Sequence, residues 1–162
     1  MSTRVLVAGV GNVFFGDDGF GPAVAQRLRD RELPAGVDVR EFGIRGIHLA
    51  YELLDGPELL IVADAVSRGG APGTLYVLEP DIDGAPGQAN AHEMDLESVF
   101  AAVRAMGGVL PRARIVGCEV ESTDAGMSLS PRVERAVEGA VQLILELLQR
   151  ECAPMRAMET SP

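Results

Sequence analysis

Runs of apolar residues alternate along the chain with segments of helical periodicity. Five short runs are predicted to form strands: 4–10, 37–43, 59–66, 74–80 and 113–119. The first and third runs, RVLVAGV and LLIVADAV, are almost continuously apolar, which is typical of parallel strands covered on both faces. The second run, VDVREFG, alternates apolar and polar residues, which favours a position nearer an edge of the sheet.

Between these runs, apolar residues recur at intervals of three and four, which predicts amphipathic helices. One stripe starts at Phe20, one lies within IHLAYELLDG, and one covers 95–107. The last stripe follows Ser130, which is expected to cap the helix N-terminus, with Pro131 at the first helical position.

Strands alternating with helices predict a three-layer α/β/α sandwich around a mainly parallel five-stranded sheet. Right-handed crossovers favour a sheet that begins with strand order 2-1-3. The link before 74–80 is too short for a helical crossover, so this strand is expected to run antiparallel, towards an edge. We assign residues 1–150 to a single domain and 151–162 to a disordered tail, and we expect 79–93 to be mobile.

Composition narrows the class of protein. Hydrophobic residues make up 47% of the chain and charged residues 23%, and no apolar run is long enough to span a membrane. The net charge of -10 disfavours nucleic acid and anionic membranes as partners. Cys118 and Cys152 form no CxxC pair, which argues against a disulfide scaffold or structural zinc. With no cleavable signal visible, we expect a cytoplasmic protein.

The turn after the first predicted strand, GNVFFGDDGFGP, carries two adjacent aspartates. Glycine-rich turns at this position commonly bind phosphate, but the GxGxxG pattern fails at Phe14, and carboxylates at Asp17 and Asp18 would repel a pyrophosphate. A nucleotide-binding domain is therefore disfavoured. One aspartate is expected to cap the helix that begins near Phe20, and we assign this turn or capping role to Asp17.

A second carboxylate, Asp64, ends an otherwise apolar strand, where burial is costly unless the group is solvated, capped or functional. In strand order 2-1-3 the carboxyl ends of strands 1 and 3 open into one crevice, so Asp18 and Asp64 are expected to converge there. The alternative is that Asp64 caps a loop amide. His92, before the helix at 95–107, would complete a nitrogen and oxygen set suited to a divalent metal, whereas His48 is expected to pack or lie at the surface.

Three motifs together resemble the hydrogenase maturation proteases, which process the large subunit of nickel-iron hydrogenases. They are GVGNVFFGDDGFG after the first strand, IVADAV at the third, and AHEMDL before the next helix. GIRG (43–46), APGTLYVLEP (71–80) and LSPRVERAVEGAV (129–141) agree, and the similarity covers residues 4–150. The resemblance implies an aspartic-type endopeptidase that removes a C-terminal extension from the large-subunit precursor, after a basic residue, once nickel has been inserted.

The resemblance also implies a site. The family's metal-contacting residues map onto Asp18, Asp64 and His92, to which we assign both the catalytic and the metal-contacting roles. Many members carry glutamate where this chain has Asp18, which is one methylene shorter. The metal would be nickel carried by the substrate, with no organic cofactor, and the enzyme is expected to be a monomer.

The mechanism allows alternatives. No Ser-His-acid set is apparent, because Ser67 lacks a nucleophile-elbow sequence and Cys118 lies within an apolar strand. The aspartates would either act as a general acid/base pair on water or hold the substrate's nickel and so position the scissile bond. We favour nickel recognition with water as nucleophile. Arg45 and the 79–93 loop are candidates for gripping the precursor's tail.

Two other functions are considered, of which the first belongs to a different class and the second is disfavoured by the short chain and the Asp-Asp-His set. One is a non-enzymatic nickel-binding or checkpoint protein in hydrogenase assembly. The other is a metal-independent peptidase with a different substrate, such as a spore protein protease.

Overall fold

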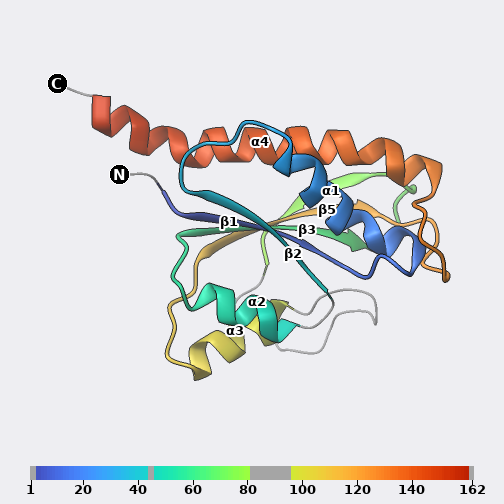
Figure 1. Ribbon diagram of the computed structural model, residues 1–162, viewed down its shortest axis with the longest axis horizontal. Coiled ribbons are helices and arrows are strands. Elements are labelled where there is room, and N and C mark those ends of the chain that lie inside the picture. The colour runs from blue at the N-terminus through green and yellow to red at the C-terminus, as the bar shows by residue number, and fades with distance from the viewer. Residues whose placement is uncertain (1–2, 44–45, 81–95, 161–162) are drawn as a thin grey trace.

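Five strands form one sheet in the order β2-β1-β3-β5-β4 (Figure 1). The computed structural model describes residues 3–43, 46–80 and 96–160, with side chains as far as Cys152. The strands are β1 (Val5–Val10), β2 (Val37–Phe42), β3 (Leu59–Val66), β4 (Leu75–Leu78) and β5 (Arg112–Glu119). The helices are the 3-10 turn η1 (Gly16–Gly19), α1 (Phe20–Arg29), α2 (Gly46–Leu53), α3 (Leu96–Ala105) and α4 (Pro131–Thr160).

The sheet confirms the predicted fold class. β1 pairs in parallel with β2 and β3, and β3 pairs in parallel with β5, which gives the expected start 2-1-3. β4 runs antiparallel to β5 at one edge, because the short link from β3 cannot carry a crossover. β2, whose apolar and polar residues alternate, forms the other edge.

Helices cover both faces of the sheet, α1 and α4 on one side and α2 and α3 on the other (Figure 1). Successive residues of the central strands serve the two cores in turn: Val5 and Val7 pack towards α1 and α4, and Leu6 and Ala8 towards α2 and α3. Burial on both faces explains why β1 and β3 read as continuous apolar runs.

The start of α1 lies in direct contact with the sheet. A Cβ on Gly21 would lie 2.2 Å from the carbonyl oxygen of Val10 and 2.4 Å from that of Ala63. Only glycine permits so close an approach. The contact brings the turn before α1 to the carboxyl ends of β1 and β3.

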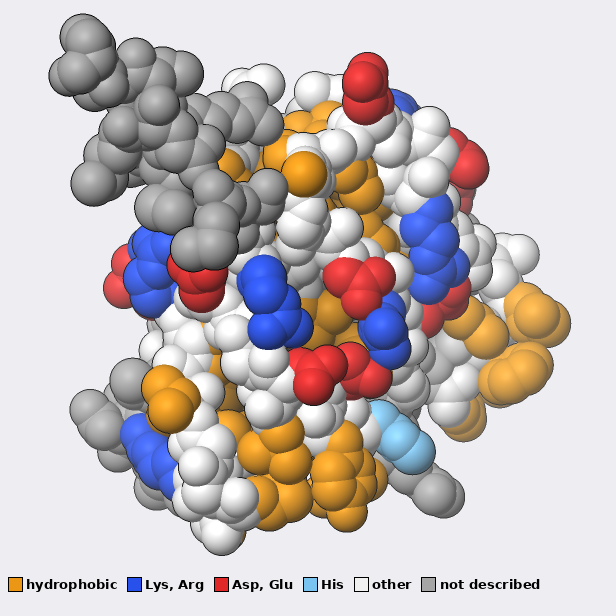
Figure 2. Space-filling model, turned by 60° about the vertical axis from the view of Figure 1, so that its left-hand side comes forward, with side chains coloured by type: hydrophobic (Ala, Val, Ile, Leu, Met, Phe, Trp, Pro, Cys, Tyr) orange, Lys and Arg blue, Asp and Glu red, His pale blue; other side chains and the backbone are white. Residues whose placement is uncertain are grey.

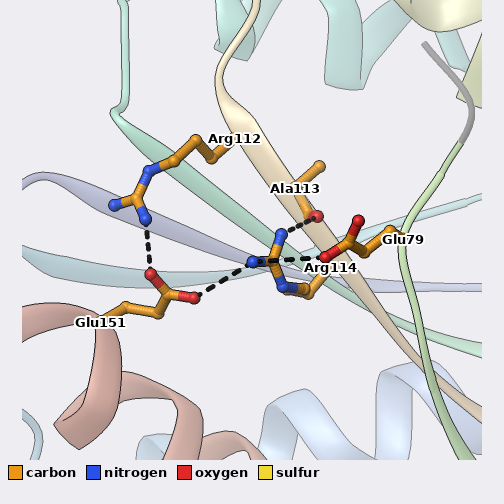
Figure 3. A network of polar contacts seen from close by, with 5 residues as sticks. All are labelled: Glu79, Arg112, Ala113, Arg114 and Glu151. Carbon is orange, nitrogen blue, oxygen red and sulfur yellow. Dashed lines mark hydrogen bonds and ion pairs between the residues drawn. The ribbon is translucent and has the colours of Figure 1, made fainter.

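The helix α4 begins at Pro131, as predicted, and the N–H of Glu134 donates to the Ser130 carbonyl at 2.8 Å. It continues to Thr160, past residue 150, where the sequence analysis ended the domain. Figure 3 shows how Glu151 anchors it: the carboxylate accepts hydrogen bonds from Arg112 and Arg114 of β5. These contacts lie at the amino end of β5.

Three sequence expectations fall on residues that the structure does not describe. They concern the 79–93 segment, of which only 79 and 80 are described, Arg45 of the GIRG motif, and His92. In the described part of the chain, no helix combines the length and apolar character needed to cross a membrane.

Candidate functional site

Buried carboxylates gather where β1, β3 and β5 end. Asp17 and Asp18 follow β1, Asp64 lies near the end of β3, and Glu119 is the last residue of β5; all four are at most 6% exposed. Because β1, β3 and β5 are parallel, their carboxyl ends lie at one edge of the sheet. Buried carboxylates are costly unless they are hydrogen-bonded or bind a cation, so each needs its own explanation.

Asp17 clamps a distant loop to the η1 turn. Its carboxylate accepts the backbone N–H groups of Glu121, Ser122 and Ser130 at 2.8, 3.0 and 2.7 Å, and the hydroxyl of Ser130 at 2.8 Å. Of the two roles predicted for Asp17, the turn role is confirmed, because Asp17 lies in η1, and the capping of α1 is wrong. The N-cap of α1 is Gly19, without a side-chain hydrogen bond, because the 3-10 turn separates the aspartates from the helix start.

These hydrogen bonds decide the charge of Asp17. Burial by itself raises the pKa of the carboxyl, but the donors from Ser122, Ser130 and Glu121 outweigh it and hold the pKa below the usual 3.8. Asp17 is therefore an anion in the folded protein at neutral pH. Its role is structural, since its lone pairs are directed at the protein itself.

Asp18 is fully buried and stabilises the turn by a hydrogen bond inside it. Its Oδ2 accepts the Asn12 N–H at 2.8 Å, and the Asn12 side chain in turn accepts the Phe14 N–H at 2.9 Å. The Asp18 carbonyl packs directly against Gly11, the residue after β1. The turn therefore holds Asp18 next to the end of the first strand.

Asp64 shares a face of β3 with Leu60 and Val62, which pack towards α2 and α3. The residue before it, Ala63, carries the carbonyl that Gly21 contacts, and η1 itself contacts β3. The structure thus brings the Asp18 and Asp64 segments together at one sheet edge. That they act as ligands or catalysts stays a prediction.

Two buried carboxylates at one edge supply the oxygen donors that a divalent cation requires. Within residues 3–43, 46–80 and 96–152, no group of three or more His, Cys, Asp and Glu side chains is arranged to hold a metal ion. His92, the predicted third member, lies outside this part of the chain. The Asp18, Asp64 and His92 set therefore stays a prediction.

A cleft of about 460 Å³ opens beside the η1 turn, at the ends of β1 and β2. It is lined by Gly11, Asn12, Val13, Pro22, Glu41, Phe42, Gly43 and His48. Clefts of this size accept peptide or ligand side chains. His48, expected from the sequence either to pack or to lie at the surface, is exposed at its rim.

Glu119 is a further buried carboxylate at this edge, and it was not among the site residues predicted from the sequence. Its carboxylate accepts the N–H groups of Arg68 and Gly70 at 3.0 Å and the hydroxyl of Tyr76 at 2.9 Å. Burial raises its pKa, but the donors prevail and the pKa lies below its usual 4.5. The sequence contains an indication of this residue, because Glu119 ends the apolar run ARIVGCE and Asp64 likewise lies near the end of the apolar third strand.

Cys118 is excluded as a nucleophile. It is fully buried, and burial, together with the negative charges of Asp17 and Glu119, raises the pKa of its thiol to about 12. Reactive cysteines need the opposite environment, one that favours the thiolate.

The sequence is similar to that of known hydrogenase maturation proteins. The HycI family model, described as hydrogenase maturation protease, matches residues 22–147. The hydrogenase 2 maturation protease of Escherichia coli strain K12 is 30% identical over 161 residues, covering 96% of this chain and 98% of that protein. The hydrogenase expression/formation protein HupD of Rhodobacter capsulatus is 36% identical over 143 residues, covering 85% of this chain and 68% of HupD.

Solved structures share the fold over most of its length. The hydrogenase maturating endopeptidase HybD from E. coli matches with a TM-score of 0.80 and 31% identity, over 91% of this chain and 93% of that chain. The hydrogenase 2 maturation peptidase from Thaumarchaeota archaeon SCGC_AB-539-E09 matches with a TM-score of 0.71 and 36% identity, over 90% and 97%.

Proposed function

This chain belongs to the hydrogenase maturation protease family, and we propose that it removes the C-terminal extension of a nickel-iron hydrogenase large-subunit precursor after nickel insertion. The observation that carries this proposal is the placement of Asp18 and Asp64. Both are buried; Asp18 lies in the turn after β1, and Asp64 lies near the end of the neighbouring strand β3. This is the edge at which doubly wound sheets bind their ligands.

In this proposal the nickel belongs to the precursor and the enzyme has no resident metal. Asp18, Asp64 and His92 contact the nickel of the correctly loaded precursor, and this contact positions the scissile peptide bond. Water is the nucleophile. A carboxylate at this edge takes a proton from water as oxygen adds to the carbonyl carbon, and the leaving amine receives a proton as the C–N bond breaks. The aspartic-type assignment rests on these roles.

The surroundings of the site favour a protein as substrate. Phe14, Phe15 and Met127 are 59%, 38% and 73% exposed, and they lie together because Phe15 bridges to Gly126. Exposed groups of large apolar side chains mark protein-binding surfaces. As part of the same proposal, the enzyme acts as a monomer in the cytoplasm.

The deciding experiment incubates the purified protein with nickel-loaded and nickel-free precursor and measures the mass of each product. Loss of a C-terminal peptide from the nickel-loaded form alone supports the proposal. Binding without mass loss would favour the non-enzymatic checkpoint protein instead. Stoichiometric nickel or zinc that survives dialysis of the enzyme against chelator would contradict the role of substrate nickel.

A further inference from the structure

Asp64 and Tyr76 lie in one row across the sheet. Asp64 of β3 pairs with Gly117 of β5, and Gly117 pairs with Tyr76 of β4. Residues in one row share a face of the sheet, so the Tyr76 ring lies on the same side as the Asp64 carboxylate. With neighbouring strands about 4.8 Å apart, their Cα atoms are separated by about 10 Å. Gly117 has no side chain that could lie between them, and the side chain of Val66 packs against Gly117.

The Glu119 carboxylate fixes the loop that joins β3 to β4. It holds the N–H groups of Arg68 and Gly70 and the Tyr76 hydroxyl at the same time, and it is 3% exposed. The packing is tight, since a Cβ on Gly70 would lie only 2.1 Å from the Tyr76 hydroxyl. The loop after β3 therefore has one defined position beside the candidate site.

Arg68 projects from this fixed loop. Its guanidinium lies over the Tyr76 ring, 5.7 Å from the centroid, and the residue is exposed. A cation–π contact of this kind holds the guanidinium near the ring without using its N–H donors. Elsewhere in the described part of the chain, basic and acidic side chains lie next to one another (Figure 2), and ion pairs hold Arg27, Arg29, Arg31, Arg40, Arg112 and Arg114.

We propose that Arg68 is a substrate-binding residue that holds a carboxylate of the precursor's C-terminal extension. The inference rests on the proposed function. A guanidinium can bind a carboxylate through two parallel hydrogen bonds, and the contact with Tyr76 leaves the N–H donors of Arg68 available for this.

The position of Arg68 limits where that carboxylate lies in the substrate. Arg68 follows Asp64 by four residues, so their Cα atoms are at most about 14 Å apart. An extended peptide covers this distance in about four residues. The bound carboxylate is therefore an acidic side chain within about four residues of the scissile bond, or the terminus of a short extension.

The test compares wild type, R68Q and R135Q on two nickel-loaded precursors. One precursor has its natural extension, and in the other the Asp and Glu residues of the extension are replaced by Asn and Gln. Arg135 is a matched control because it is an exposed arginine on α4 that loses the same charge. In a third precursor the extension is lengthened by neutral residues, so that its terminal carboxylate lies farther from Arg68. This precursor distinguishes binding of the terminal carboxylate from binding of an acidic side chain.

Loss of a charge-assisted contact is expected to raise KM by about tenfold in R68Q on the natural precursor, with kcat nearly unchanged. R135Q should behave as wild type. The R68Q effect should disappear on the neutral extension, or on the lengthened one if the terminus is the ligand. Equal R68Q effects on all three precursors, or none on any, would overturn the inference. Failure of the wild type to cut any precursor would instead contradict the proposed function.

Discussion

Asp17 and Ser130 are joined by hydrogen bonds across 113 residues of sequence, from both the backbone N–H and the hydroxyl of Ser130. The same carboxylate holds Glu121 and Ser122, so one side chain connects the η1 turn, the loop after β5 and the start of α4. The turn that carries Asp18 is thereby fixed from a second direction, in addition to its contact with β1. Precise positioning of Asp18 depends on this remote support.

The first prediction concerns the loss of this clamp. D17A removes the acceptor of the partly buried hydrogen bonds from the N–H groups of Glu121, Ser122 and Ser130, and a donor left unsatisfied costs up to about 1–3 kcal/mol. We expect the free energy of unfolding to fall by about 3 kcal/mol, measured by urea denaturation. D30N, at an exposed aspartate after α1, is the control and should stay close to wild type. A D17A protein as stable as D30N would contradict the clamp.

The second prediction follows from the charge of Asp17 and Glu119. In the folded protein the pKa of Asp17 lies below its usual 3.8 and the pKa of Glu119 lies below its usual 4.5. Both carboxylates therefore stabilise the folded protein at a pH above these usual values. This stabilisation is lost as the pH falls through the pKa values of the folded protein. We expect the free energy of unfolding to decrease steeply below about pH 4.5. The slope should be smaller in D17N and in E119Q. Denaturation series between pH 7 and pH 3 measure it, and an unchanged slope in both variants would show that other groups carry the acid sensitivity.

The arrangement of the sheet could be predicted because its signals are local. The continuous apolar runs of β1 and β3 reflect burial on both faces, and the short link before β4 alone decides that β4 is antiparallel. The placement of Asp18 and Asp64 at one edge follows from strand order, because a parallel sheet collects its carboxyl ends on one side.

The hydrogen-bond partners could not be predicted in this way. Asp64 and Glu119 present the same signal, an acidic residue that ends an apolar strand. The donors to Glu119 are Arg68, Gly70 and Tyr76, which are 43 to 51 residues away in the chain. Asp17 and Asp18 are likewise adjacent, yet only the folded loop at 121–130 identifies Asp17 as structural. Partners at such separations are determined by tertiary packing, which local patterns do not record.

The third prediction tests the carboxylates assigned to the site. D18N and D64N remove a negative charge but keep nearly the same shape, so each should slow precursor processing by at least about 100-fold if the carboxylate contacts the substrate's metal or the reacting water. D18E should keep measurable activity, because it retains the charge and adds only one methylene. Product masses over time give the rates, and thermal unfolding confirms that the variants fold. Processing by D64N at the wild-type rate would contradict the site.

The fourth prediction concerns Cys118. With its thiol buried and its pKa at about 12, only about one molecule in ten thousand carries the thiolate at pH 8. Iodoacetamide should therefore leave Cys118 unmodified in the folded protein and modify it only in denaturant, as peptide mass mapping would show. C118A should retain processing activity, with a loss of stability of about 1 kcal/mol from the space left under β5. Rapid alkylation of Cys118 in the folded protein, accompanied by loss of processing, would restore a cysteine nucleophile and displace water from that role.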